Sequence, residues 1–149
     1  MKKIIFIVLA LVLVACGGGG TSSEFDQNVT KWNDAGVSHY RMQVGVSCFC
    51  PFADINPITV EVRDGQIVSM VGANGAEVLD TDPAYVTLAQ YANVDSLFTW
   101  LGDALANADK VEVTYDATYG FPTSIAVDFI TEATDDEIWI DISNFEVVE

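Results

Sequence analysis

The sequence predicts an α+β fold: a six-stranded antiparallel sheet with two main helices on one face. Three observations point to it. Apolar residues first recur with a helical period, then alternate with a period of two in three successive runs, and this order is repeated. Short connections between the alternating runs favour antiparallel pairing. Each run has one polar and one apolar side, which places both helices on the same face and divides the domain into two helix-plus-three-strand units.

The beginning of the chain is typical of a lipoprotein signal peptide. Two lysines precede an uninterrupted apolar run from Ile4 to Val14, which has secretory length and is too short to span a bilayer. The stretch LVAC at residues 13–16 resembles a bacterial lipobox, in which cleavage before the cysteine leaves Cys16 as the lipidated first residue. Residues 1–15 are therefore expected to be a signal peptide, and Cys16 to carry the diacylglyceryl and palmitate groups of a membrane anchor.

The remaining chain divides into a tether and one domain. GGGGTSS follows Cys16 directly, so residues 16–23 are expected to form the lipidated cysteine and a flexible Gly/Ser tether. Residues 24–149 are enough for a single globular α+β domain with its own core. These features place the protein in the bacterial cell envelope, attached to the membrane by lipid. Gly17 resembles the signal for the outer membrane of a Gram-negative host.

The charge of the chain limits its partners. It has 22 acidic residues against 6 lysines and arginines, and its formal net charge is −16. A surface of this sign repels nucleic acid and anionic lipid head groups, so neither is expected as a partner. Hydrophobic residues make up 50% of the chain, which is too large a share for disorder beyond the tether.

The first unit is expected to begin with a helix that Ser23 caps. Phe25, Val29 and Trp32 lie at i, i+4 and i+7 on one face of that helix. Gly36 stands just beyond its last turn, where glycine suits a helix end.

Three strands are then expected in the first unit. Residues 40–50 alternate between apolar and polar side chains, which predicts one long half-buried strand with Cys48 and Cys50 on its core side. The stretch ITVEVRDGQIVSMV follows, with Asp64-Gly65 between two alternating runs. This is the pattern of a β-hairpin with a two-residue turn.

The second unit begins in a less regular stretch. Asp82-Pro83 predicts the start of a short helix through Gln90. A longer helix is expected after Asp95, and its apolar side consists of Phe98, Leu101, Leu105 and Ala108. Strands are expected in the alternating runs at residues 111–115, 125–129 and 138–142. The alternation breaks near Asn144, which predicts a bulge there.

Several short motifs stand in a distinctive order along the chain. They are Trp32, Tyr40, the Cys48/Cys50 pair, VEVRDG, Leu97-Phe98, Tyr115-Asp116, GFPT at residues 120–123, and Asp128. In this order and spacing they resemble the small bacterial lipoproteins grouped as domain of unknown function 6174. The resemblance extends roughly from Trp32 to Phe145, nearly the whole expected domain. It implies the fold and the envelope location, and it implies no catalytic residue, because the group has no established activity.

Cys48 and Cys50 are the cysteines that remain once Cys16 is lipidated. An exported location is oxidising, so a disulfide between them is expected. Two extended residues set their Cα atoms about 6.6 Å apart, so the strand must bend to close the bond. The first interpretation is a local clip that shapes the strand end. Two reduced buried thiols and a redox role of the pair are the alternatives.

Neither a metal nor a cofactor is expected. Zinc would need two more ligands besides the two thiols, and the only histidine, His39, lies on the other strand face and far along the strand. A lone histidine also argues against a Ser/His or Cys/His nucleophile, so His39 is interpreted as a surface residue at a strand start. The acidic stretches at residues 80–82 and 135–137 lack the spacing of a calcium loop and suit turns.

The remaining candidates lie on the polar side of the sheet. Asp116, Asp128 and Asp141 are expected on the outer face of three neighbouring strands, and Trp139 is expected on the same face. Exposed aromatic residues beside acids suit a surface that binds another protein. A solvated sheet face and a paired-carboxylate hydrolytic site are the other interpretations.

The function expected from the sequence is therefore that of a lipid-anchored envelope module. It is expected to be non-enzymatic and to bind an unknown protein partner through the acidic sheet face. The main alternative is a redox or thiol-handling role of Cys48 and Cys50, and hydrolysis at an acidic cleft is the third.

Overall fold

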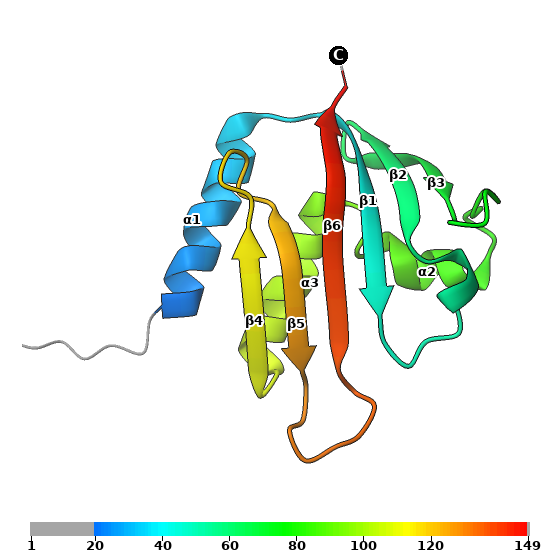
Figure 1. The fold of residues 1–149 in the computed structure, drawn as a ribbon. Helices are drawn as coiled ribbons and strands as arrows, with labels where there is room; N and C mark the ends of the chain where they lie inside the picture. The colour runs from blue at the N-terminus through cyan, green and yellow to red at the C-terminus, as the bar shows by residue number, and fades with distance from the viewer. Residues whose placement is uncertain (1–19, 149) are drawn as a thin grey trace, which may run out of the picture.

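The computed structural model describes residues 20–148, in which one helix precedes three strands and two further helices precede another three strands (Figure 1). The expected signal peptide and Cys16 lie outside the described residues. The helices are α1 (Gly20–Ala35), α2 (Pro83–Ala89) and α3 (Val94–Asn107), with a 3-10 turn, η1 (Ala53–Ile55). The strands are β1 (His39–Ser47), β2 (Ile58–Arg63), β3 (Gln66–Val71), β4 (Lys110–Tyr115), β5 (Pro122–Asp128) and β6 (Ile138–Val147).

The six strands form one antiparallel sheet in the order β3-β2-β1-β6-β5-β4. This confirms the predicted α+β fold and its six-stranded antiparallel sheet. The first half of the sheet, β1 to β3, follows α1, and the second half, β4 to β6, follows α2 and α3. The halves join at the centre, where β1 pairs with β6. The chain thus runs from centre to edge in the first half and from edge back to centre in the second.

The helices leave one face of the sheet open. Figure 1 shows α2 and α3 behind the sheet and α1 beside the β4 edge. Ile138, Ile140 and Ile142 of β6 are buried on the helix side, while Trp139 and Asp141 between them are exposed. We call the side opposite α2 and α3 the outer face. Within residues 20–148, no helix combines the length and the apolar character needed to cross a membrane.

Two helix starts differ from the sequence prediction. Helix α1 begins at Gly20, so Ser23 lies inside it instead of capping it, and the Ser23 hydroxyl accepts a hydrogen bond from Gln27 at 3.2 Å. Threonine and serine at positions 21–23 are all residues that cap helices, so composition does not distinguish the true start. Helix α3 begins one residue before Asp95, because the Asn93 side chain accepts from the backbone N–H of Asp95 at 2.9 Å.

The first strand is shorter than predicted. β1 ends at Ser47, so Cys48 and Cys50 follow the strand instead of lying within it. The pairing explains this end: β2 begins opposite Val44, and β6 pairs with β1 no further than Ser47. Beyond that point the backbone has no strand partner, and the Cys50 N–H donates to the Cys48 carbonyl at 2.8 Å in a tight turn.

The predicted hairpin and bulge are both present. Asp64 and Gly65 have φ angles of 49° and 73° and connect β2 to β3, as a two-residue turn of this type requires. Asn144 has a φ of 53°, and the register between β1 and β6 shifts between Arg41 and Gln43. The bulge moves Phe145 toward the core, where its ring stacks on Phe121 at 4.3 Å between centroids.

Candidate functional site

The outer face around Trp139 consists of rows of paired residues across four strands. Trp139 lies between Ser47 of β1 and Ala126 of β5, and Ala126 pairs in turn with Glu112 of β4. The neighbours of the indole within its row are therefore small. The Trp139 residue is 48% exposed as a consequence. A large aromatic side chain thus lies on an open sheet surface that none of the helices within residues 20–148 covers.

Beside the indole the surface is hollowed. The hollow has a volume of about 220 Å³ and is lined by Lys110, Glu112, Ala126, Val127, Asp128, Glu137 and Trp139. We call it the Trp139 hollow. Three of its residues are carboxylates and one is an amine, so it combines an aromatic surface with an excess of negative charge. Glu112 and Lys110 sit at alternate positions of the KVEV run in β4, so their shared face follows from the strand period.

Lys110 is the one cation among the residues of the Trp139 hollow. Its Nζ lies 2.9 Å from Glu112 Oε1, and it stands directly opposite Asp128 in the β4–β5 pairing. The hydrogen bond to Glu112 raises the pKa of Lys110, with a smaller contribution from the charge of Asp128. The same bond lowers the pKa of Glu112. Both side chains are largely exposed, so water weakens this ion pair.

The structure brings three of the four predicted surface residues together and separates the fourth. Asp128 and Trp139 line the Trp139 hollow, and Asp141 lies next along β6, where it accepts a hydrogen bond from the Ser124 hydroxyl at 2.8 Å. Asp116 instead follows the far end of β4, in the turn to β5. Its Oδ1 accepts from the backbone N–H groups of Thr118 and Tyr119 at 2.8 and 2.6 Å. Asp116 therefore shapes the turn after β4 and does not line the Trp139 hollow.

Cys48 and Cys50 lie with their sulfur atoms within bonding distance and their Cα atoms 5.2 Å apart. Both are partly buried and pack against the core. Phe49 between them points away from the protein and is 87% exposed. Because Ser47 pairs with Trp139, this turn lies at the same end of the sheet as the Trp139 hollow.

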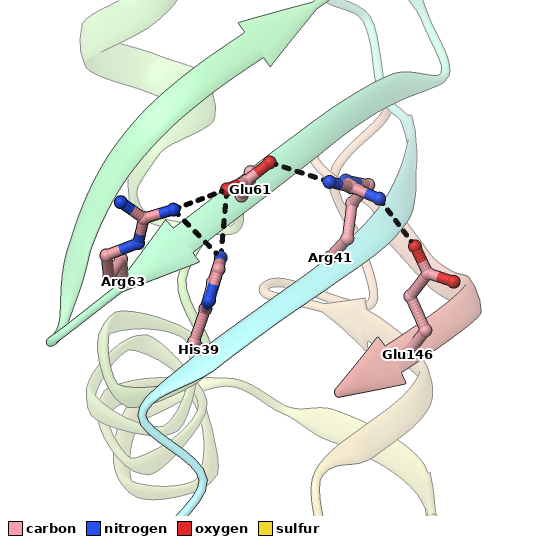
Figure 2. Close-up of polar contacts among 5 residues, drawn as sticks. All are labelled: His39, Arg41, Glu61, Arg63 and Glu146. Atoms are coloured by element: carbon pink, nitrogen blue, oxygen red, sulfur yellow. Dashed lines mark hydrogen bonds and ion pairs between the residues drawn. The ribbon is translucent and has the colours of Figure 1, made fainter. Parts of the chain in front are cut away.

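An ion-pair cluster at the other end of the outer face was not predicted (Figure 2). Glu61 of β2 binds His39 and Arg41 of β1, each at 2.9 Å, and Arg63 at 3.3 Å. Arg41 also reaches Glu146 of β6 at 2.7 Å. Hydrogen bonds from His39 and then Arg41 lower the pKa of Glu61 to about 2. His39 is therefore a partly buried member of a network, not an isolated surface residue.

The cluster suits a structural role, because its charged groups bind one another. The cluster follows from the antiparallel register of β1 and β2, which pairs His39 with Arg63 and Arg41 with Glu61. The alternating pattern of a single strand does not contain this register. Within residues 20–148, no group of three or more histidines, cysteines and acids is placed to hold a metal ion.

The motif residues near α1 have a packing role. Trp32 contacts Tyr40, Phe121 and Phe145 edge to face, with ring centroids 5.5 to 6.3 Å apart. Its indole N–H donates to Asp95 at 2.8 Å, which links α1 to α3. Gly120 has a φ of 84°, and a Cβ there would lie 2.8 Å from a backbone oxygen of α1. These motif residues therefore hold α1 against the sheet.

Comparison with known protein families gives a match over most of the chain. The model of a family described as "Family of unknown function (DUF6174)" matches residues 24–147. No curated protein matches the chain, and no solved structure matches it.

Proposed function

We propose that this chain, which belongs to the family of unknown function DUF6174, is a non-enzymatic binding module whose outer face holds a protein partner at Trp139. In the same proposal the domain is attached to the bacterial envelope membrane through a lipidated Cys16. The family match extends over residues 24–147. The family carries no activity that could assign a reaction to the chain, so the proposal depends on the surface of the domain.

The exposed Trp139 is the observation that carries this proposal. When a partner covers a tryptophan, a large apolar area is removed from water. It is also among the residues that contribute most to protein–protein binding when they lie at the centre of an interface. The residues beside Trp139 in its row, Ser47 and Ala126, are small and leave the indole accessible to a partner.

A redox role for Cys48 and Cys50 is the second candidate, and one observation favours it. The two sulfur atoms lie within bonding distance and are separated by a single, highly exposed residue, Phe49. A partner that exchanged thiols would meet this exposed turn first. Packing of both cysteines against the core argues against it, because a thiol that reacts with a substrate must be accessible.

Site-specific photo-crosslinking in the producing cell tests the binding function. A photoreactive phenylalanine analogue is placed at Trp139 in one strain and at Val86 in a control strain. Val86 is also a highly exposed apolar residue, but it lies on α2, behind the sheet. We expect a discrete crosslinked product with the analogue at Trp139 and not at Val86. No product at Trp139, or the same products at both positions, would overturn the proposed binding face.

A further inference from the structure

We propose that the Trp139 hollow receives a basic side chain, an arginine or lysine of the protein partner, and that Lys110 is the resident cation this side chain displaces. The inference rests on the proposed binding function and adds the chemistry of the partner. It depends on three features of the hollow: an accessible indole, an excess of carboxylates, and an internal amine already held by one of them.

The indole and the carboxylates suit a cation together. The face of a tryptophan ring is the best aromatic surface for Lys or Arg, because its electron density attracts positive charge. Glu112, Asp128 and Glu137 line the same hollow. A side chain placed there meets an aromatic surface on one side and acceptors for its N–H groups on the other.

Lys110 shows that the hollow accommodates a positively charged amine. Its amine already occupies a position among these carboxylates, 2.9 Å from Glu112. Its side chain is 64% exposed and flexible, so the pair is weak and easily exchanged for a stronger one. An arginine could bind a carboxylate with two parallel hydrogen bonds, which the lysine amine cannot do.

The charge of the whole chain points to a protein segment as the source of this cation. The amine-bearing lipid head groups also carry a phosphate, which a protein with a net charge of −16 repels. A basic peptide segment carries no such anion, and its charge is complementary to the chain as a whole.

A peptide titration tests the proposal. The chain is purified as the cell produces it, in neutral detergent at about 0.15 M salt, where charges more than about 8 Å apart are screened. The probe is a rhodamine-labelled hexa-arginine peptide, and its control is the hexa-citrulline peptide, which has the same shape without the charge. We expect the arginine peptide to bind and the citrulline peptide not to. Trp139→Ala should weaken binding about three- to fivefold.

Charge variants separate the hollow from the general acidity of the surface. Glu112→Gln should weaken arginine-peptide binding about twofold, whereas Asp103→Asn, an equal change of charge on α3, should leave it unchanged. Lys110→Gln should strengthen binding about twofold, because it frees Glu112 and Asp128. Its control is Lys31→Gln on α1, with thermal melts to verify the fold, since Lys31 donates to the Ala117 carbonyl.

The outcomes divide clearly between this inference and the proposed function. Equal binding of both peptides, no binding of the arginine peptide, or an effect of Lys110→Gln no different from that of Lys31→Gln would overturn the basic partner. Binding of soluble phosphocholine in place of the peptide would overturn it as well. If the Trp139 crosslink persists in any of these cases, the binding face stands with a partner of different chemistry. Loss of the crosslink overturns both.

Discussion

Glu61 is the carboxylate that holds the ion-pair cluster together. It accepts from His39 on one oxygen and from Arg41 on the other, each at 2.9 Å (Figure 2). Its pKa falls from 4.5 to about 2, first through the bond from His39 and then through that from Arg41. The neighbouring strands β1 and β2 are thereby linked on the outer face by ion pairs as well as by backbone hydrogen bonds.

The lowered pKa of Glu61 predicts a pH dependence. A carboxylate whose pKa is lower in the folded state stabilises the fold fully above its unfolded value, and this contribution is lost as the pH falls through the folded value. The relevant window is therefore from pH 4.5 down to about 2. Thermal melts should show Glu61→Gln less stable than wild type at pH 7, with the difference shrinking across this window. Glu132→Gln, an exposed glutamate in the loop before β6, is the control. If the melting temperatures of wild type and Glu61→Gln fell by the same amount between pH 4.5 and about 2, the prediction would be contradicted.

The cysteine pair yields a second residue-scale prediction. A bond between Cys48 and Cys50 closes a loop of only three residues, so its contribution to stability is expected to be no more than about 2 kcal/mol. The double variant with Cys48→Ser and Cys50→Ser should therefore remain folded in buffer. Its free energy of unfolding, measured by chemical denaturation, should fall by no more than this amount. It should also retain the crosslink at Trp139.

Alkylation of the folded protein, followed by mass measurement, shows the state of the pair. We expect label on Cys48 and Cys50 only after reduction. Two labelled thiols without reductant would contradict the disulfide. Reduction as ready as that of a thioredoxin-like catalyst would favour the redox role over the structural one.

The alternation of apolar and polar residues predicts which face of the sheet most of the candidate surface residues lie on. It does not predict which side chains they contact. Trp139 and Asp141 point outward as the period of β6 requires. Asp116 follows the last residue of β4, and its carboxylate binds the turn, which the alternation does not predict. The contacts of His39 and Lys110 depend on strand register, which a single strand pattern does not contain.

At the scale of elements, Asn93 connects α3 to the β2–β3 hairpin. Its side-chain oxygen caps α3 by accepting from Asp95 and Ser96, at 2.9 and 3.4 Å. Its side-chain amide donates to the Gly65 carbonyl in the hairpin turn at 2.8 Å. Asn93 is only 5% exposed, so both roles are carried out away from water. The hairpin turn and the helix start are thus held by one side chain.

Removal of this cap should be costly. Asn93→Ala loses the cap and leaves the Gly65 carbonyl without its partner, so we expect a loss of about 2–4 kcal/mol. Ser23→Ala is the matched control, because Ser23 lies exposed within α1 and alanine is the better helix former. We expect the control to change stability by less than about 0.5 kcal/mol. Denaturant titration of both variants measures this. A Ser23→Ala loss as large as that of Asn93→Ala would mean that α1 starts at Ser23 after all.

The elements themselves were largely predictable because their signals are local. The Asp64-Gly65 turn, the Pro83 helix start and the bulge at Asn144 each depend on residues next to one another. The end of β1 was not predictable in this way, since Cys48 continues the alternation while the neighbouring strands do not continue beside it. Strand ends are decided by partners that lie elsewhere in the sequence.

At the scale of the whole molecule, the aromatic residues of the family motifs pack in the core and hold the elements together. Trp32, Tyr40 and Phe121 belong to one aromatic cluster with Phe145, which ties α1 to the junction of the two halves of the sheet. A fold can be recognised from such residues, because close packing restricts them strongly. Of the motif residues, Asp128 lies on the candidate binding face, where it lines the Trp139 hollow.

The proposed membrane attachment of the domain depends on Cys16, and the sequence makes a direct prediction for it. Stable anchoring requires more than one acyl chain, which a diacylglyceryl cysteine supplies. Mass spectrometry of membrane-extracted protein should show the mature chain beginning at Cys16 with this group attached. Cys16→Ala should leave uncleaved precursor or move the protein out of the lipid-modified fraction.

The double serine variant of Cys48 and Cys50 is the control for Cys16→Ala, because it removes two cysteines outside the lipobox-like stretch. It should retain the lipid, because neither cysteine lies in the lipobox-like stretch at residues 13–16. A mature chain that begins anywhere other than Cys16 would contradict the anchor. The crosslink at Trp139 and the stability predictions would be unaffected, because they depend only on the folded domain.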